Sequence, residues 1–183
     1  MKRVILLFLA VTAVGCSSDS LSVKKATSLI NDFTQQYPVF ESESIHLGER
    51  KLRMNKDAEE IAALKNLESQ KLIVLKTNEV RKKLLSKDSV WDVTITLTTD
   101  ASKYVLDQRK NKAEVKTYLF TIQENSDVEL KLNTKTKATA KAKLIKEPTP
   151  FAGLSKDKNP NSEFITRDFV LKYKEEVGWY VQK

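Results

Sequence analysis

Apolar residues follow a helical period in two stretches of the chain. Over residues 22–37 they recur at every third or fourth position, which places them on one helical face, and Pro38 follows the stretch. The same spacing returns over residues 58–70, where Asn55 or Asp57 can cap the first turn. We therefore predict two helices that pack on the core by their apolar faces.

A two-residue alternation, typical of half-buried strands, dominates the rest of the chain. It is clearest over residues 91–97, where Trp, Val, Ile and Leu alternate with Asp and Thr. Residues 71–75 and 118–122 also predict strands. The polar and basic residues 79–85 predict a loop, and residues 39–53 show no clear period.

The longest alternation runs over residues 128–144, with small and apolar residues on one face and mostly lysines on the other. As one strand it would exceed about 50 Å, at about 3.3 Å per residue, which is well beyond a typical strand. We therefore expect it to bend sharply or to break near Asn133. A terminal hairpin is predicted at residues 164–173 and 177–181, with Trp179 in the core.

These elements together predict an α+β fold. The helices and first strands would form a mixed N-terminal lobe at residues 21–108, and the later strands an antiparallel C-terminal lobe at residues 114–183. The polar stretch between them is the expected boundary. The alternative is a single α+β domain in which one sheet wraps the first helix, similar to NTF2-like or cystatin-like domains.

The middle of the chain has a further resemblance. The order of helix, strand, loop, strand and short helix over residues 55–106 resembles the recognition helix and wing of winged-helix domains. The resemblance rests on residues 63–73 followed by residues 97–100. It concerns shape alone, because a fold does not determine a function.

The first residues follow a pattern of another kind. Lys2 and Arg3 precede an apolar run at residues 4–14, which is about half the roughly 20 residues that a membrane-spanning helix needs. A basic start before a short apolar run predicts a secretory signal that is removed from the mature protein.

The end of this signal, Ala13-Val14-Gly15-Cys16, resembles the lipobox of bacterial lipoproteins, which is typically Leu-Ala-Gly-Cys. The resemblance implies that residues 1–15 are cleaved off between Gly15 and Cys16, and that Cys16 carries lipid. Residues 16–20 would then be a short tether. Two or three acyl chains hold a protein stably on a membrane. The alternative is an ordinary secretory signal in which the cysteine is coincidental.

The residue after the cysteine bears on localisation. In enterobacterial lipoproteins, Asp at that place favours retention in the inner membrane, whereas this chain has Ser17. The resemblance therefore implies an anchor in the outer membrane, with the body in the periplasm.

Composition adds two constraints. Cys16 is the only cysteine, so a lipidated chain has no thiol left for a disulfide. The net charge is +8, and the chain stays basic when Lys2 and Arg3 are removed with the signal. In the envelope, we expect the partners to be a protein or an anionic lipid or glycan, and not nucleic acid.

The lysines of the long alternating stretch are the candidate binding residues. They would share one face of an extended segment and could contact an anionic surface. The alternative is a solvated strand face whose lysines discourage edge-to-edge pairing of strands. The four residues are Lys135, Lys137, Lys141 and Lys143.

Catalytic and metal-binding patterns are weak. His46 is the only histidine and has Glu49 three residues later, a pair that lacks the second histidine of a zinc-protease motif. We therefore expect no metal site, no cofactor and no catalytic residue. The predicted function is a non-catalytic, lipid-anchored envelope protein that binds a partner close to the membrane. The alternative is an envelope hydrolase that uses carboxylates or a Ser/Lys pair, at residues 22–25 or 155–158.

Overall fold

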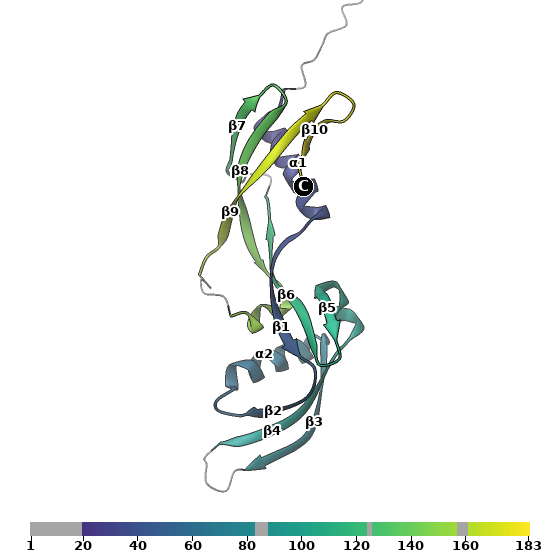
Figure 1. The fold of residues 1–183 in the computed structure, drawn as a ribbon. Helices are drawn as coiled ribbons and strands as arrows, with labels where there is room; N and C mark the ends of the chain where they lie inside the picture. The colour runs from purple at the N-terminus through teal and green to yellow at the C-terminus, as the bar shows by residue number, and fades with distance from the viewer. Residues whose placement is uncertain (1–19, 83–87, 124–125, 157–160) are drawn as a thin grey trace, which may run out of the picture.

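Two antiparallel sheets lie at opposite ends of an elongated molecule, and each is packed against one α-helix (Figure 1). The computed structural model describes residues 20–82, 88–123, 126–156 and 161–183. The predicted signal, the lipobox and most of the tether fall outside these residues. None of the helices in the described ranges has the length and apolar character needed to cross a membrane.

The larger sheet has seven strands, in the order β1-β6-β8-β9-β10, with β5 paired to β6 and β7 paired to β8. All of its pairings are antiparallel. The strands are β1 (Val39–His46), β5 (Val105–Arg109), β6 (Lys112–Thr121), β7 (Val128–Thr134), β8 (Lys137–Pro148), β9 (Phe164–Lys174) and β10 (Gly178–Val181).

Helix α1 (Val23–Gln36) fills the curl of this sheet (Figure 1). Its first turn is capped by Ser22, whose Oγ accepts a hydrogen bond from the backbone N–H of Lys25 at 3.2 Å. The helix contacts both β7 and β10, which are the two sides of the curled sheet. The apolar face predicted from the sequence is therefore the face that closes this core.

The inner face of β8 lies in the same core as α1. Ala138, Ala140 and Ala142 are fully buried together with Ala26 and Ile30 of the helix. Small side chains on both elements let the helix and the sheet approach closely. The small face of the long alternating stretch is therefore part of the core closed by α1.

The smaller sheet has the order β2-β4-β3 and forms a second core with helix α2. From α2, Ile61, Leu64 and Leu67 are buried in this core, and Trp91 of the central strand lies there too. The elements are β2 (Gly48–Arg53), α2 (Ala58–Ser69), β3 (Ile73–Lys82), β4 (Ser89–Leu97), and the short 3-10 helices η1 (Thr99–Tyr104) and η2 (Pro150–Leu154).

Several local predictions are confirmed. The two helices and the strand at residues 91–97 are present as α1, α2 and β4. The long alternating stretch breaks at residues 135–136, close to Asn133, and becomes the hairpin β7–β8. The terminal hairpin is β9–β10, and Trp179 is buried in the same core as Phe169.

The predicted α+β class is wrong, in its two-lobe form and in its single-domain alternative, because the described chain is mostly strand. Residues 39–53 form β1 and β2, and β3 continues through residues predicted to be a loop. Most of their side chains are partly or fully exposed on both faces, so burial imposes no clear alternation on the sequence.

The winged-helix resemblance of residues 55–106 is also wrong. Helix α2 packs on the three-stranded sheet, and η1 leads into β5, which pairs with β6 of the larger sheet. The described residues of this segment therefore contribute strands to two sheets, and helix α2 has a sheet as its packing partner.

The lobes at residues 21–108 and 114–183 stay a prediction. The hairpin β5–β6 occupies the predicted boundary. Each hydrophobic core takes side chains from both sides of it, since α1 packs with the C-terminal strands and Phe151 packs with α2 and the smaller sheet.

Candidate functional site

The described chain starts at one end of the molecule, beside the tips of two hairpins. In Figure 1, α1 begins near the turns that join β7 to β8 and β9 to β10. We call residues 20–25, 131–137 and 172–177 the tether end. A tether from Cys16 to Ser20 spans at most roughly 15 Å, at about 3.5 Å per residue.

The tether end is strongly basic. Lys135 lies in the β7–β8 turn, and Lys137 is aligned with Lys172 of the neighbouring strand. Two glutamates of the β9–β10 turn, Glu175 and Glu176, oppose these charges. The lysines outnumber them, because the segments contain Lys24, Lys25, Lys131, Lys135, Lys137, Lys172 and Lys174.

Large apolar side chains are exposed at the same end, one on each of its three segments. The exposed fraction is 49% for Val23 at the start of α1, 59% for Leu132 near the end of β7, and 68% for Val177 in the β9–β10 turn. Aliphatic side chains that project among lysines are typical of surfaces that enter the headgroup region of a bilayer.

The four candidate lysines do not form one uniform stripe. Lys135 and Lys137 belong to the tether end, whereas Lys141 is aligned with Glu129 on β7 and with Asp168 on β9. The Nζ atom of Lys143 lies 4.2 Å from the ring centroid of Phe164. The predicted face therefore divides into a basic tip, a lysine between carboxylates, and a lysine over an aromatic ring.

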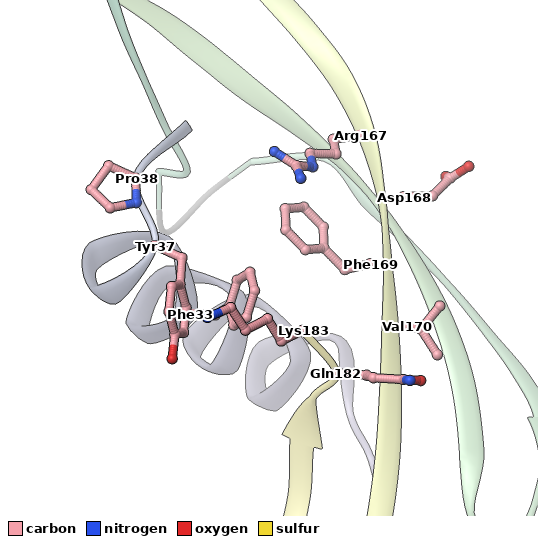
Figure 2. A pocket seen from close by; sticks show the side chains of 9 residues that line it. All are labelled: Phe33, Tyr37, Pro38, Arg167, Asp168, Phe169, Val170, Gln182 and Lys183. Atoms are coloured by element: carbon pink, nitrogen blue, oxygen red, sulfur yellow. The ribbon is translucent and has the colours of Figure 1, made fainter. Parts of the chain in front are cut away.

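A groove beside the C-terminal end of α1 is the second candidate. It has a volume of about 540 Å³, and its walls come from the end of α1, from β9 and from the last residues of the chain. Figure 2 shows Arg167 and Phe169 pointing from β9 toward the helix, with Asp168 on the other side of the strand. Phe33 and Tyr37 form the opposite wall.

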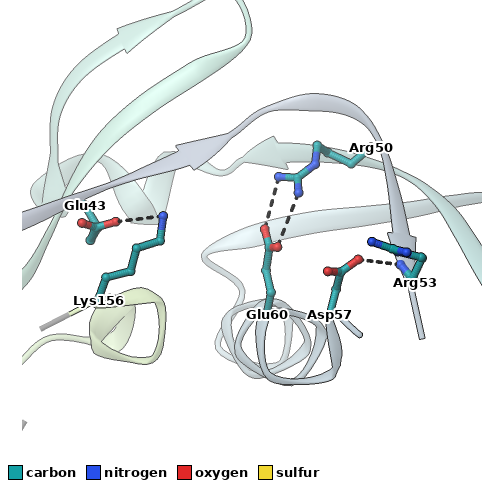
Figure 3. Close-up of polar contacts among 6 residues, drawn as sticks. All are labelled: Glu43, Arg50, Arg53, Asp57, Glu60 and Lys156. Carbon is teal, nitrogen blue, oxygen red and sulfur yellow. Dashed lines mark hydrogen bonds and ion pairs between the residues drawn. The ribbon is translucent and has the colours of Figure 1, made fainter. Parts of the chain in front are cut away.

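A third hollow, of about 610 Å³, lies where the two halves of the molecule meet. It contains His46, which is exposed, and several charged side chains. Arg50 binds both carboxylate oxygens of Glu60, at 3.2 and 3.4 Å, and the Nζ atom of Lys156 lies 3.9 Å from a carboxylate oxygen of Glu43 (Figure 3). The first pair joins β2 to α2, and the second joins β1 to the residues that follow η2.

The same hollow bears on the predicted chemistry. Ser155 lies there next to Lys156, while Lys158 of the predicted Ser/Lys pair falls outside the described residues. Within the described ranges, no three His, Cys, Asp or Glu side chains are grouped so that they could hold a metal ion. Glu43 and Glu60 each lie within ion-pair distance of a cation in this hollow.

Sequence reasoning named two lysines of the tether end, Lys135 and Lys137, and missed the groove. Gly15 and Cys16, the residues of the predicted lipidation site, fall outside the described residues. The groove is assembled from three distant segments, at residues 33–38, 167–170 and 182–183. Its one local signal is the spacing of Arg167 and Phe169, which places both side chains on the same face of a strand.

Comparison with known proteins gives no relative for this chain: no family model, no curated protein and no solved structure matches it.

Proposed function

We propose that this protein is a non-catalytic, lipid-anchored protein of the bacterial envelope, and that its tether end docks on anionic lipid. One observation carries the proposal. The first described residues, which follow the predicted lipid attachment site in the sequence, lie at the end of the molecule where lysines and exposed aliphatic side chains gather.

The anchor and the surface act together in this proposal. A lysine close to an anionic membrane contributes about 1 kcal/mol, which is weak for any single residue. A short tether keeps the surface at a high effective concentration beside the bilayer, so weak contacts become occupied. Val23, Leu132 and Val177 add apolar contacts at the level of the headgroups.

The proposal also assigns an orientation. The tether end rests on the membrane, and the long axis of the molecule points away from it. The smaller sheet and α2 then project into the periplasm from the outer membrane, which is the location implied by Ser17.

Lipidation is tested by labelling cells with a radioactive fatty acid. The full chain should incorporate the label, and its mature N-terminus should be a lipidated Cys16. A Cys16→Ser variant should lose both the label and its membrane association. The proposed lipid anchor would be contradicted if the full chain incorporated no fatty acid, or if the Cys16→Ser variant still fractionated with membranes.

Docking is tested with an environment-sensitive dye on the lipidated full chain in vesicles. Lipid occupies Cys16, so a Val177→Cys variant has one free thiol for the dye. We expect a blue shift of its emission in vesicles that contain phosphatidylglycerol, and a much smaller shift in phosphatidylcholine vesicles. The matched control is Val80→Cys, because Val80 is 57% exposed and belongs to β3, a strand at the opposite end of the molecule.

Charge reversal separates docking from the anchor alone. Lys135→Glu combined with Lys137→Glu should remove the blue shift while the protein stays vesicle-bound through its lipid. The control pair, Lys76→Glu with Lys82→Glu on β3, should leave the shift unchanged. The docking proposal would be overturned if both pairs of charge reversals gave the same blue shift. It would also be overturned if the dye shifted equally at positions 177 and 80.

A further inference from the structure

Strand β9 extends beyond the short strand β10, which pairs with one of its edges. Within the described chain, β8 pairs with residues 164–172 of β9, whereas β10 pairs only with residues 171–174. The edge of β9 that faces β10 is therefore without a partner strand from Phe164 to Phe169. At about 3.3 Å per residue, the open stretch is roughly 20 Å long.

The direction of the backbone groups on this edge follows from one hydrogen bond. The N–H of Gln182 donates to the carbonyl of Val170 at 2.8 Å, so the backbone groups of Val170 point toward β10. Along a strand these groups alternate in direction, and the pairing of β9 with β8 has no register shift. Asp168 and Thr166 therefore present their N–H and C=O groups to the open edge.

The aromatic groove lies beside this edge. The ring of Phe33 is 5.0 Å from that of Tyr37 and 6.2 Å from that of Phe169, measured between centroids. Figure 2 shows these rings on the helix side of β9, where alternate side chains of an added strand would point. The groove, at about 540 Å³, has room for an apolar side chain and a neighbouring carboxylate.

Two cations flank the rings. The guanidinium carbon of Arg167 lies 5.7 Å from the ring centroid of Phe169, and the Nζ atom of Lys183 lies 4.5 Å from that of Tyr37. The carboxylate of Asp168 is on the opposite face of β9. The groove thus combines apolar walls with positive charge, which complements an acidic segment that carries an apolar residue.

We propose that the open edge of β9 binds an extended acidic segment of a partner protein as an added strand, in line with β10. Its backbone pairs with Thr166 and Asp168, an apolar side chain packs on Phe33, Tyr37 and Phe169, and a carboxylate lies between Arg167 and Lys183. Strand addition of this kind takes affinity from backbone hydrogen bonds and specificity from alternate side chains. It does not depend on docking to lipid.

The test uses the lipidated full chain in phosphatidylcholine nanodiscs and a blocked peptide probe of sequence acetyl-Thr-Asp-Val-Phe-Val-Asp-amide. Binding is measured from the amide NMR shifts of residues 164–170. We expect saturable shifts at Thr166 and Asp168, and at least tenfold weaker binding of the same peptide with Lys in place of Asp. An absence of saturable shifts at millimolar peptide would overturn the proposal.

A pair of variants isolates the backbone contact. Proline is tolerated on an edge strand where its missing N–H would face outward. Asp168→Pro should therefore fold and lose at least tenfold in affinity, whereas Asp168→Ala, which keeps the N–H, should bind the probe like the original chain or better. Equal affinity of the two variants would overturn strand addition.

Two further measurements keep the test decisive if Asp168→Pro does not fold. Two variants of the peptide are N-methylated at alternate residues, one at the odd positions and one at the even positions. Only one of the two should lose binding, because an added strand forms backbone hydrogen bonds with its neighbour through alternate residues. Arg167→Glu should weaken binding at least tenfold, with Arg109→Glu on β5 as the control. Sensitivity to charge without sensitivity to N-methylation, or binding of phosphatidylglycerol in place of the peptide, would contradict the proposal.

Discussion

At the scale of single residues, Thr149 connects the two halves of the molecule. Its hydroxyl donates to the carbonyls of Lys116 and Thr117, at 2.6 and 3.0 Å, and accepts the N–H of Phe151 at 3.1 Å. Thr149 is buried, and Phe151 is fully buried in the core formed with α2. One side chain therefore fixes the end of β8, the middle of β6 and the start of η2.

Replacement of Thr149 by Val should lower the stability of the protein, although the two side chains have nearly the same volume. Thr149→Val leaves the buried N–H of Phe151 without its acceptor, and a lost buried partner costs about 1–3 kcal/mol. The free energy of unfolding, measured by denaturant titration, should fall by that amount. Thr166→Val on an exposed position of β9 is the matched control and should change stability far less. Equal effects would show that the hydroxyl has no structural role.

The surroundings of a side chain could be predicted from the sequence only where they depend on residues nearby in the chain. Lys137, Lys141 and Lys143 share one face of β8 because of alternation alone. Whether each one meets a carboxylate depends on register, and Lys141 lies between Glu129 and Asp168 through two strand pairings. The groove around Phe33 and Phe169 depends on the packing of α1, which no local pattern specifies.

At the scale of elements, the first turn of α1 depends on one N-cap residue. Its start is fixed by the hydrogen bond from the N–H of Lys25 to the Oγ atom of Ser22. No acidic side chain lies in the first turn to compensate for the loss of this cap. The helix closes the larger core, so weakening its first turn weakens the contacts with β7 and β10.

Ser22→Ala should therefore destabilise the protein by about 1 kcal/mol, the usual cost of a lost N-cap. Ser22→Asp should restore the stability, because its carboxylate accepts the same N–H and favours the helix N-terminus. Thermal unfolding followed by circular dichroism measures both changes. A stable Ser22→Ala variant would show that packing alone fixes the start of α1.

Elements were predictable where one face is buried and the other is exposed. This holds for α1, α2, β4 and the hairpins β7–β8 and β9–β10 of the larger sheet. It fails for β1, which passes from one core to the other, and for the outer half of β3, which is exposed on both faces. A strand with no single buried face has no alternation to detect.

At the scale of the whole molecule, the two cores share strands. Ile45 of β1 belongs to the core with α2, while Val39 of the same strand packs on the core with α1. Strand β6 is divided in the same way, with Val115 in one core and Phe120 in the other. Loss of either core would remove the support on one half of both strands.

We therefore expect the two cores to unfold together. The chain has two tryptophans, Trp91 in the core with α2 and Trp179 in the core with α1. Trp91→Phe and Trp179→Phe each leave one fluorophore, so denaturant titrations of the two variants report on one core each. Each curve should coincide with the circular dichroism transition of its own variant. Separate transitions would show that β1 and β6 do not couple the cores.

The arrangement of the two sheets was beyond prediction from the sequence. The pattern indicates antiparallel hairpins, but it does not say that β1 pairs with β6 or that α1 closes a sheet built mainly from the other end of the chain. Such long-range pairings carry no local signature.

The packing of α1 has a consequence for the order of events in time. The helix is synthesised long before β9 and β10, and its core partners Leu171 and Trp179 come near the end of the chain. Until they arrive, β7 and β8 can cover only part of the apolar face of α1, and the core with α2 can assemble first from nearer segments. Completion of the larger core is therefore a late step, and a ribosome that stops before Trp179 leaves the side of α1 that faces β10 uncovered.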